Sequence, residues 1–153
     1  MSSSSHSDEQ LRQLFREHVP EVAAGFVELV ALARGSGRLI VAVRSNDDRI
    51  HPVSACGGLR GIYMKTISRE LGGEKLNIVL WSESLESFIL AAIAPYGPTA
   101  IKTPKVTLDA AAHQAKVDVN RDTFTYFAGQ GERLRLASKL VGWDIQLICH
   151  EQN

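Results

Sequence analysis

The feature that most constrains the fold of this chain is a repeat of glycines and basic residues at an interval of 70 positions. Gly61 and Gly131 are separated by this interval, and so are Gly72 and Gly142. Three further pairs match at the same offset: Lys65 with Arg135, Ser68 with Ser138, and Arg69 with Lys139. Self-similarity at a fixed interval indicates copies of one structural module. The 153 residues are therefore expected to form two small modules.

The expected helices and strands follow the same order in each copy. The segment DEQLRQLFREHVPEV is predicted to form an amphipathic helix with Leu11, Leu14, Phe15 and Val22 on its apolar face. Residues 26–34 fit a helix or a strand by periodicity alone. The Gly-Ser-Gly turn and the run LIVAV that follow them favour a hairpin.

Turn residues and apolar spacing assign the remaining segments. In the first copy these are a helix over 52–57, a helix over 62–71 that ends in left-handed glycines, and a strand over 74–81. In the second they are a helix over 82–95 capped by Ser82 and ended by Pro95, a hairpin of 105–109 and 115–119, a helix–glycine–helix unit over 123–143, and a strand over 143–149. The predicted core positions of helix 62–71 are Ile62, Met64, Ile67 and Leu71.

The sequence GGLRG, residues 57–61, lies between two of the predicted helices. It lacks the spacing of a P-loop and of a dinucleotide-binding loop. A G-x-x-G turn before a helix brings main-chain N–H groups and the helix N-terminus close to phosphates, and Arg60 adds a charge. This device is the one by which a K homology module clamps about four nucleotides. A plain helix–helix turn that needs flexible backbone is the alternative.

Composition argues against several other classes of protein. Lys+Arg and Asp+Glu both number 17, which argues against strong non-specific affinity for nucleic acid but leaves room for a local basic face. No apolar run approaches the roughly 20 residues of a membrane span. The five histidines are scattered without metal-ligand spacing, so no metal, other cofactor or catalysis is predicted. Cys56 and Cys149 lack a C-x-x-C partner, which indicates a reducing cytoplasm, with Cys56 a packed small hydrophobe. For Trp81 and Trp143, packing is favoured over base stacking.

Three segments resemble the tandem K homology region of the bacterial and archaeal transcription factor family NusA. They are SNDDRIHPVSACGGLRG, ELGGEKLNIVLWSES and RLRLASKLVGWDIQL, within a resemblance that covers about residues 19–148. The resemblance implies an α+β fold of two type II K homology modules, each a mixed three-stranded sheet with helices on one face, in the order α-β-β-α-α-β. It implies a strand over 26–34. The expected boundaries are a polar tail with a short helix over 1–18, a first module over 19–82 and a second over 83–153.

The resemblance also implies a function. A monomer without membrane association would bind single-stranded RNA and regulate transcription elongation, termination or antitermination, with RNA polymerase and other transcription factors as further partners. The implied and inferred contacts are Gly58, Leu59, Arg60, Gly61, Lys65 and Arg69 in the first copy, and Gly129, Gln130, Gly131, Arg133, Arg135 and Lys139 in the second. A solvated helix face is the alternative for the basic pairs. A K homology fold that serves as a protein-interaction platform on the transcription or translation machinery is the alternative function.

The sequence departs from the family pattern in two respects. The second loop reads AGQG, so Ala128 replaces its first glycine and no cation lies within it. Residues 20–82 carry a net charge of +2 and residues 83–153 a net charge of −1, so the first module is expected to bind more tightly. The polymerase-binding and S1 domains of full elongation factors have no counterpart, which leaves a stand-alone pair of modules and an excised fragment as alternatives.

Overall fold

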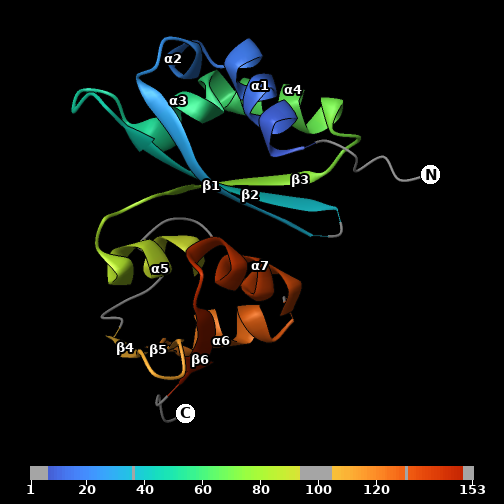
Figure 1. Cartoon of the computed structure of the whole chain (residues 1–153). Helices are drawn as coiled ribbons and strands as arrows, with labels where there is room; N and C mark the ends of the chain where they lie inside the picture. Colours follow the sequence, from blue (N-terminus) through green and yellow to red (C-terminus); the bar gives the residue numbers. More distant parts are fainter. Residues whose placement is uncertain (1–6, 36, 94–104, 130, 150–153) are drawn as a thin grey trace. The chain divides into compact units, whose positions relative to one another are not determined.

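The computed structural model describes residues 7–35, 37–93, 105–129 and 131–149 of the chain. The chain divides into two compact units, Met1–Trp81 and Ser82–Asn153. Each unit contains one three-stranded sheet (Figure 1). In the described residues, no helix is long and apolar enough to cross a membrane.

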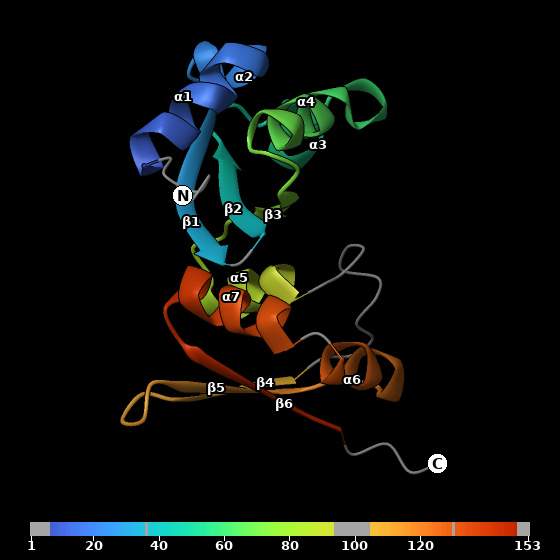
Figure 2. The same cartoon turned by 90° about the vertical axis from the view of Figure 1, so that its right-hand side faces the viewer.

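Unit 1 contains a mixed sheet with its helices on one face (Figure 2). Its elements are α1 Asp8–His18, α2 Pro20–Ala23, β1 Val27–Gly35, β2 Arg38–Ser45, α3 Pro52–Gly57, the 3₁₀ turn η1 Leu59–Gly61, α4 Ile62–Glu70 and β3 Lys75–Leu80. The central strand β2 is antiparallel to β1 and parallel to β3. The parallel pair needs a crossover connection, and α3 and α4 supply it.

The core of unit 1 forms between its helices and the sheet. Leu11 and Phe15 lie one turn apart on α1 and pack with Ile67 of α4 and with Leu39 and Val41 of β2. Burial of one such side chain contributes roughly 1.5–3 kcal/mol. The helix expected ahead of the first module therefore belongs to the core of unit 1.

An ion pair fastens β1 to the segment that precedes β3. Arg34 of β1 donates to both carboxylate oxygens of Glu74, with Nη2 at 3.1 Å from each. The two side chains are only 18% and 11% exposed. The hydroxyl of Ser68 on α4 donates to the Glu74 carbonyl, so the link from α4 to β3 is held from both sides.

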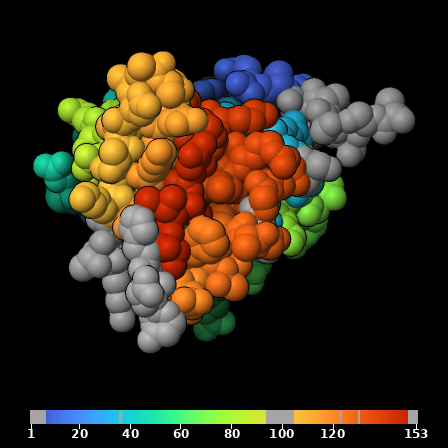
Figure 3. Space-filling view, turned by 90° about the horizontal axis from the view of Figure 1, so that it is seen from below, coloured from blue at the N-terminus to red at the C-terminus, as the bar shows by residue number. Residues whose placement is uncertain are grey.

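Unit 2 repeats this arrangement, with α5, α6 and α7 on one face of its sheet (Figure 2). Its elements are α5 Leu85–Ile93, β4 Lys105–Asp109, β5 Gln114–Asp118, α6 Arg121–Ala128, α7 Gly131–Val141 and β6 Asp144–Ile148. Strand β5 is antiparallel to β4 and parallel to β6. Figure 3 shows the β4–β5 hairpin in yellow-orange beside β6 in red. Ala115, Val117 and Ile145 of the sheet are buried, as are Leu136 and Leu140 of α7.

These observations confirm the predicted α+β class, with a mixed three-stranded sheet and helices on one face in each unit. The predicted cap of α5 differs in detail. The Ser84 hydroxyl accepts a hydrogen bond from the Ser87 amide, whereas the Ser82 hydroxyl accepts from Ser84 in the turn before the helix. Serine is favoured at the N-cap of a helix, so the sequence is compatible with Ser82 or Ser84 in that position. The position of the first helical turn selects Ser84. Pro95, the expected end of the helix, lies outside the described residues.

Candidate nucleic-acid interface

The bend between α3 and α4 contains three residues with left-handed or glycine-only backbone conformations, Gly58, Arg60 and Gly61. Gly58 has φ 74° and ψ −178°, after which η1 reverses the chain. Arg60 (φ 57°, ψ 26°) and Gly61 (φ 71°, ψ 23°) are both left-handed. The Gly61 amide donates to the Gly58 carbonyl at 3.1 Å, which closes the turn. Helix α4 then begins at Ile62 without a side-chain cap on its first turn.

The two glycines of the bend are required for different reasons. A Cβ on Gly58 would lie 2.5 Å from Cδ2 of Tyr63, so the ring packs directly on this glycine. A Cβ on Gly61 would have no atom within 4 Å. Gly58 is therefore fixed by packing within the unit, whereas Gly61 is fixed only by its positive φ and leaves open space above the backbone.

Apolar side chains around the bend are exposed. Leu59 is 83% exposed and Ile62 is 49% exposed, and Arg60 between them is exposed as well. Ile62 was predicted in the core, which is wrong, whereas Ile67 and Leu71 are buried as predicted. Helical spacing places all four near one side of α4, but the first turn of the helix extends beyond the sheet that covers the others.

A groove of about 480 Å³ lies beside the bend, between α4 and β3. Its lining residues are Met64, Lys65, Ser68, Arg69, Gly73 and Leu76. Lys65 and Arg69 are exposed, whereas Met64 and Leu76 are half-buried. The groove thus has apolar side chains of the size that contact a base and cations that can reach its backbone.

Three cations near the groove differ in their partners from most of the other arginines of unit 1, although Arg12 and Arg38 also bond uncharged groups, the Leu29 carbonyl and the Asn77 side chain. Among the described residues, Arg60, Lys65 and Arg69 form no ion pair. Four arginines elsewhere in the unit pair with an acid: Arg16 with Glu9, Arg34 with Glu74, Arg44 with Glu28, and Arg49 with Asp47. Three positive charges therefore remain available for an external anion at the bend and along α4.

The second loop has a different backbone from the first. Gly129 is exposed and Gly131 begins α7, and neither has a positive φ. Gln130, a predicted contact between them, lies outside the described residues. The left-handed bend of unit 1 is therefore not repeated at these two glycines.

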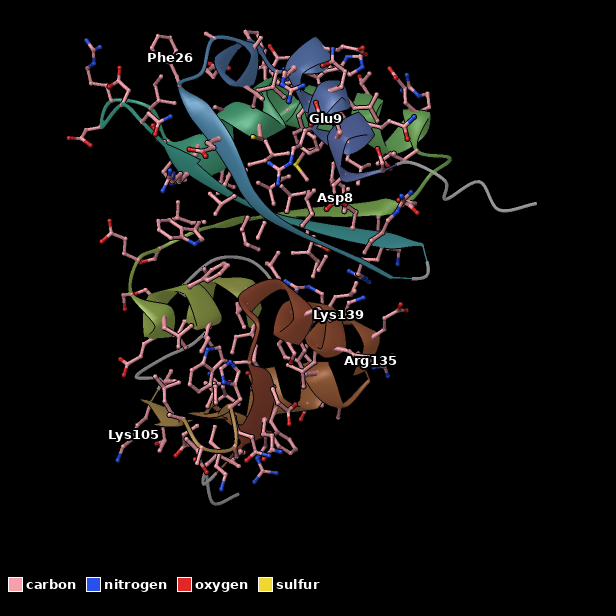
Figure 4. All side chains as sticks on the ribbon, viewed as in Figure 1. Asp8, Glu9, Phe26, Lys105, Arg135 and Lys139 are labelled. Atoms are coloured by element: carbon pink, nitrogen blue, oxygen red, sulfur yellow. The ribbon has the colours of Figure 1, made fainter. Side chains whose placement is uncertain are left out.

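The predicted basic contacts of the second copy separate into two groups. Arg135 and Lys139 are exposed one turn apart and project from α7 (Figure 4). Arg133 is only 3% exposed, because the first turns of α7 direct its side chain inward. Sequence spacing from the loop could not distinguish the inward from the outward positions of this helix.

Cys56 at the end of α3 is a buried, unreactive thiol. It is fully buried within the core of unit 1, which confirms the prediction of a packed small hydrophobe. Burial, and to a smaller extent the charge of Glu21, raises the pKa of its thiol to about 12. Because the thiolate is the nucleophile of cysteine chemistry, Cys56 is not a candidate catalytic group.

Three ionisable side chains gather where the ends of α1 and α4 meet. Nε2 of His18 lies 2.6 Å from Oε2 of Glu70, and Glu17 contributes a further carboxylate within 4.8 Å. This cluster was not predicted from the sequence, because His18 and Glu70 are 52 positions apart and lie on different helices. Its evident role is to pair α1 with α4.

The groove lining is the part of the site that sequence analysis missed. Met64 was assigned to the core, and Ser68, Gly73 and Leu76 were not assigned to the site at all. A signal did exist, since Met64 and Ser68 are spaced by four residues beside the pair Lys65 and Arg69. Only the position of β3 shows that this side of α4 faces a groove.

Each unit has the element order and mixed sheet of a type II K homology module, with a helix–glycine loop–helix segment between its second and third strands. The crystal structure of APE1850 has the same fold, with a TM-score of 0.65 over 93% of this chain and 96% of that one, at 18% identity. The particular family follows from the sequence. The chain belongs to the NusA-like K homology family, whose model for the first K homology domain matches residues 5–81.

Similar proteins in bacteria support this assignment. The chain is 37% identical over 147 residues to the transcription termination/antitermination protein NusA of Rickettsia prowazekii, covering 95% of this chain and 29% of that protein. It is 40% identical over 137 residues to the NusA protein of Thermus thermophilus, covering 88% of this chain and 34% of that protein. The chain thus spans about a third of the length of these relatives.

Proposed function

We propose that this chain binds single-stranded RNA, chiefly through unit 1, as a non-catalytic module in transcription termination or antitermination. The observation that supports this most directly is the set of cations without ion pairs at the bend and groove. Arg60, Lys65 and Arg69 form no ion pair among the described residues, although acids pair with four of the six other arginines in the unit. The names of the relatives supply the link to transcription.

The proposed contacts follow the shape of unit 1. The phosphate backbone passes over Gly61, where the space above the backbone is open, and meets the first turn of α4, which no side chain caps. Arg60 pairs with a phosphate beside the bend. Bases enter the groove against Met64 and Leu76, and Lys65 and Arg69 flank them.

Unit 2 contributes a weaker contact in this proposal. Arg135 and Lys139 are exposed along α7 in the places that Lys65 and Arg69 hold on α4, and Gly129 and Gly131 border the second loop. Without positive φ at either glycine and without a cation in the loop, phosphate binding is expected to be weaker there. Arg133 is left out because its side chain is buried.

The salt dependence of binding tests the proposal. For single-stranded nucleic acid, the slope of log K against log salt is about −0.7 per phosphate contact, so contacts by Arg60, Lys65 and Arg69 predict about −2. Arg60→Ala should reduce the magnitude of the slope by about 0.7. Arg49→Ala is a matched control, because it removes one exposed arginine that already pairs with Asp47.

The asymmetry between the loops is tested in a filter-binding assay. Arg60→Ala is expected to weaken binding of a short unstructured RNA more than Gln130→Ala does. A larger loss from Gln130→Ala would contradict the assignment of the stronger contact to unit 1.

A second candidate function is a protein-interaction platform that retains the K homology fold, on RNA polymerase or another part of the transcription or translation machinery. The net charge of zero and the altered second loop favour it. No binding of unstructured RNA even at low salt would support this function and contradict RNA binding.

A further inference from the structure

The two units differ by one large side chain shortly after the helix that carries the basic pair. In unit 1, Lys65, Arg69 and Gly73 follow one another at intervals of four residues and line the same groove. The residues 70 positions later are Arg135, Lys139 and Trp143. An indole in unit 2 thus occupies the sequence position at which unit 1 has a groove-lining glycine.

The link from helix to strand explains how the indole is accommodated. In unit 1, residues 71–74 connect α4 to β3, whereas Gly142 and Trp143 alone connect α7 to β6. Gly72 and Gly142 are both left-handed, with φ of 78° and 80°, so the two helices end in the same manner. A Cβ on Gly73 would meet no atom within 4 Å, which shows that this end of the groove in unit 1 is open space.

Trp143 is held by a second aromatic ring. The imidazole of His113, in the turn between β4 and β5, stacks on the indole with ring centroids 4.2 Å apart and an interplanar angle of 19°. The Asp144 amide donates to the His113 carbonyl at 3.0 Å, which fixes the turn against the start of β6. His113 is exposed and Trp143 is half-buried, so the pair lies at the surface.

The backbone of His113 gives independent support. In the described part of the chain, the non-glycine residues with positive φ are Arg60, at 57°, and His113, at 56°. The first lies in the proposed phosphate contact. Left-handed conformations of non-glycine residues cost free energy and concentrate at functional sites. The corresponding residue in unit 1 is Gly37, whose carbonyl accepts from Lys75 as that of His113 accepts from Asp144.

We propose that Trp143, stacked on His113, is a base-stacking platform just beyond the C-terminal end of α7 that receives a base of the bound RNA. This inference rests on the proposed RNA binding and extends it. From Gly131 to Val141 the helix advances about 15 Å at 1.5 Å per residue, past Arg135 and Lys139, and Trp143 follows two residues later. A strand that follows α7 meets two cations and then the aromatic pair. Stacking is tolerant of sequence because every base has a π-face.

Base stacking on Trp143 compensates for the phosphate contacts that the second loop does not make. Unit 2 has no loop cation, and its glycines lack the left-handed bend. Stacking on an aromatic side chain is a source of affinity that is independent of phosphate contacts. Unit 1 therefore binds mainly by charge and unit 2 mainly by stacking.

The test uses the full chain and the decanucleotide r(A)10. Trp143→Ala is expected to weaken binding about 5- to 150-fold, the range for loss of one base–aromatic stack. Trp143→Phe, which keeps a ring, should stay within about threefold of the wild type. Neither change should alter the slope of log K against log salt, whereas Arg60→Ala should.

A spectroscopic measurement separates stacking from a structural role. In a Trp81→Phe protein, the fluorescence comes from Trp143 alone, and r(A)10 is expected to quench it at saturation. Unchanged fluorescence at saturation would contradict base stacking on Trp143, and so would unchanged affinity in a folded Trp143→Ala protein. If Arg60→Ala still weakens binding in that case, the proposed RNA binding stands without the stacking platform. If the wild type fails to bind r(A)10 at low salt, both the platform and the proposed function are overturned.

Discussion

Replacing Gly58 with alanine tests the account of the bend most directly. Its backbone, at φ 74° and ψ −178°, lies in a region that is essentially restricted to glycine. An added Cβ would also lie 2.5 Å from the ring of Tyr63, a separation that forces the ring to move. Gly61→Ala is the matched control, because Gly61 also has positive φ but has open space where the Cβ would lie.

The two effects can be estimated separately. A residue held in a sparsely populated backbone region costs of order 1–3 kcal/mol, and overpacking adds roughly 1–3 kcal/mol. Gly58→Ala should therefore lower the free energy of unfolding of unit 1 by about 2–6 kcal/mol. Gly61→Ala should lower it by about 1–2 kcal/mol, the cost of a left-handed conformation alone.

Urea denaturation provides the measurement, with Trp81 fluorescence reporting unit 1 in a Trp143→Phe background. The double variant Gly58→Ala/Tyr63→Ala separates the contributions, because it removes the ring but retains the unfavourable φ. A favourable coupling of about 1–3 kcal/mol is expected between the two sites. Equal destabilisation by Gly58→Ala and Gly61→Ala, or a coupling near zero, would refute the packing argument.

Three further predictions concern the stability and chemistry of the protein. Glu74→Gln should lower the free energy of unfolding of unit 1 by about 1–3 kcal/mol, because Arg34 would lose a charged, largely buried acceptor. Denaturation in low and in high salt should give similar losses, because salt screens a buried ion pair only weakly. In native protein at pH 8, iodoacetamide should modify the partly exposed Cys149 while Cys56 stays unmodified, since a pKa of about 12 leaves about a thousandfold fewer thiolates than the ordinary thiol pKa of 9.0. Because the pKa of Cys56 is higher in the folded than in the unfolded state, its protonated thiol contributes fully to the free energy of unfolding below about pH 9. This contribution is lost as the pH rises toward 12. Equal denaturation midpoints at pH 8.5 and 11.5 would contradict this.

The internal repeat made most of the fold accessible from sequence. The 70-residue offset predicted two copies of one module, and the glycines at 72 and 142 marked the end of the same helix in each. Turn residues then located the hairpins, since Gly37 and His113 both precede a central strand. These signals are local, and local conformation is what glycine, proline and β-branched residues determine most strongly.

The site was predictable only in part, because a groove depends on two elements that are distant in sequence. Met64 and Ile62 satisfy the helical spacing of core residues, yet one lines a groove and the other is exposed. Arg133 follows a glycine as a contact residue would, yet its side chain is buried. Periodicity shows that a helix has an apolar side but does not show where the neighbouring sheet ends.

A basic helix can bind an external anion only where its cations have no ion-pair partner within the protein. Which cations have such a partner depends on the tertiary structure. The formal charge of zero gave no reason to expect free cations. In unit 1 the acids are used elsewhere: Glu74 neutralises Arg34 within the link to β3, and Glu70 turns toward His18 of α1. Glu70 directly follows Arg69 in sequence but lies on another side of α4. The groove therefore keeps its positive charge although the chain as a whole has none, and a salt-dependent affinity to which Arg60, Lys65 and Arg69 contribute most is the physical consequence.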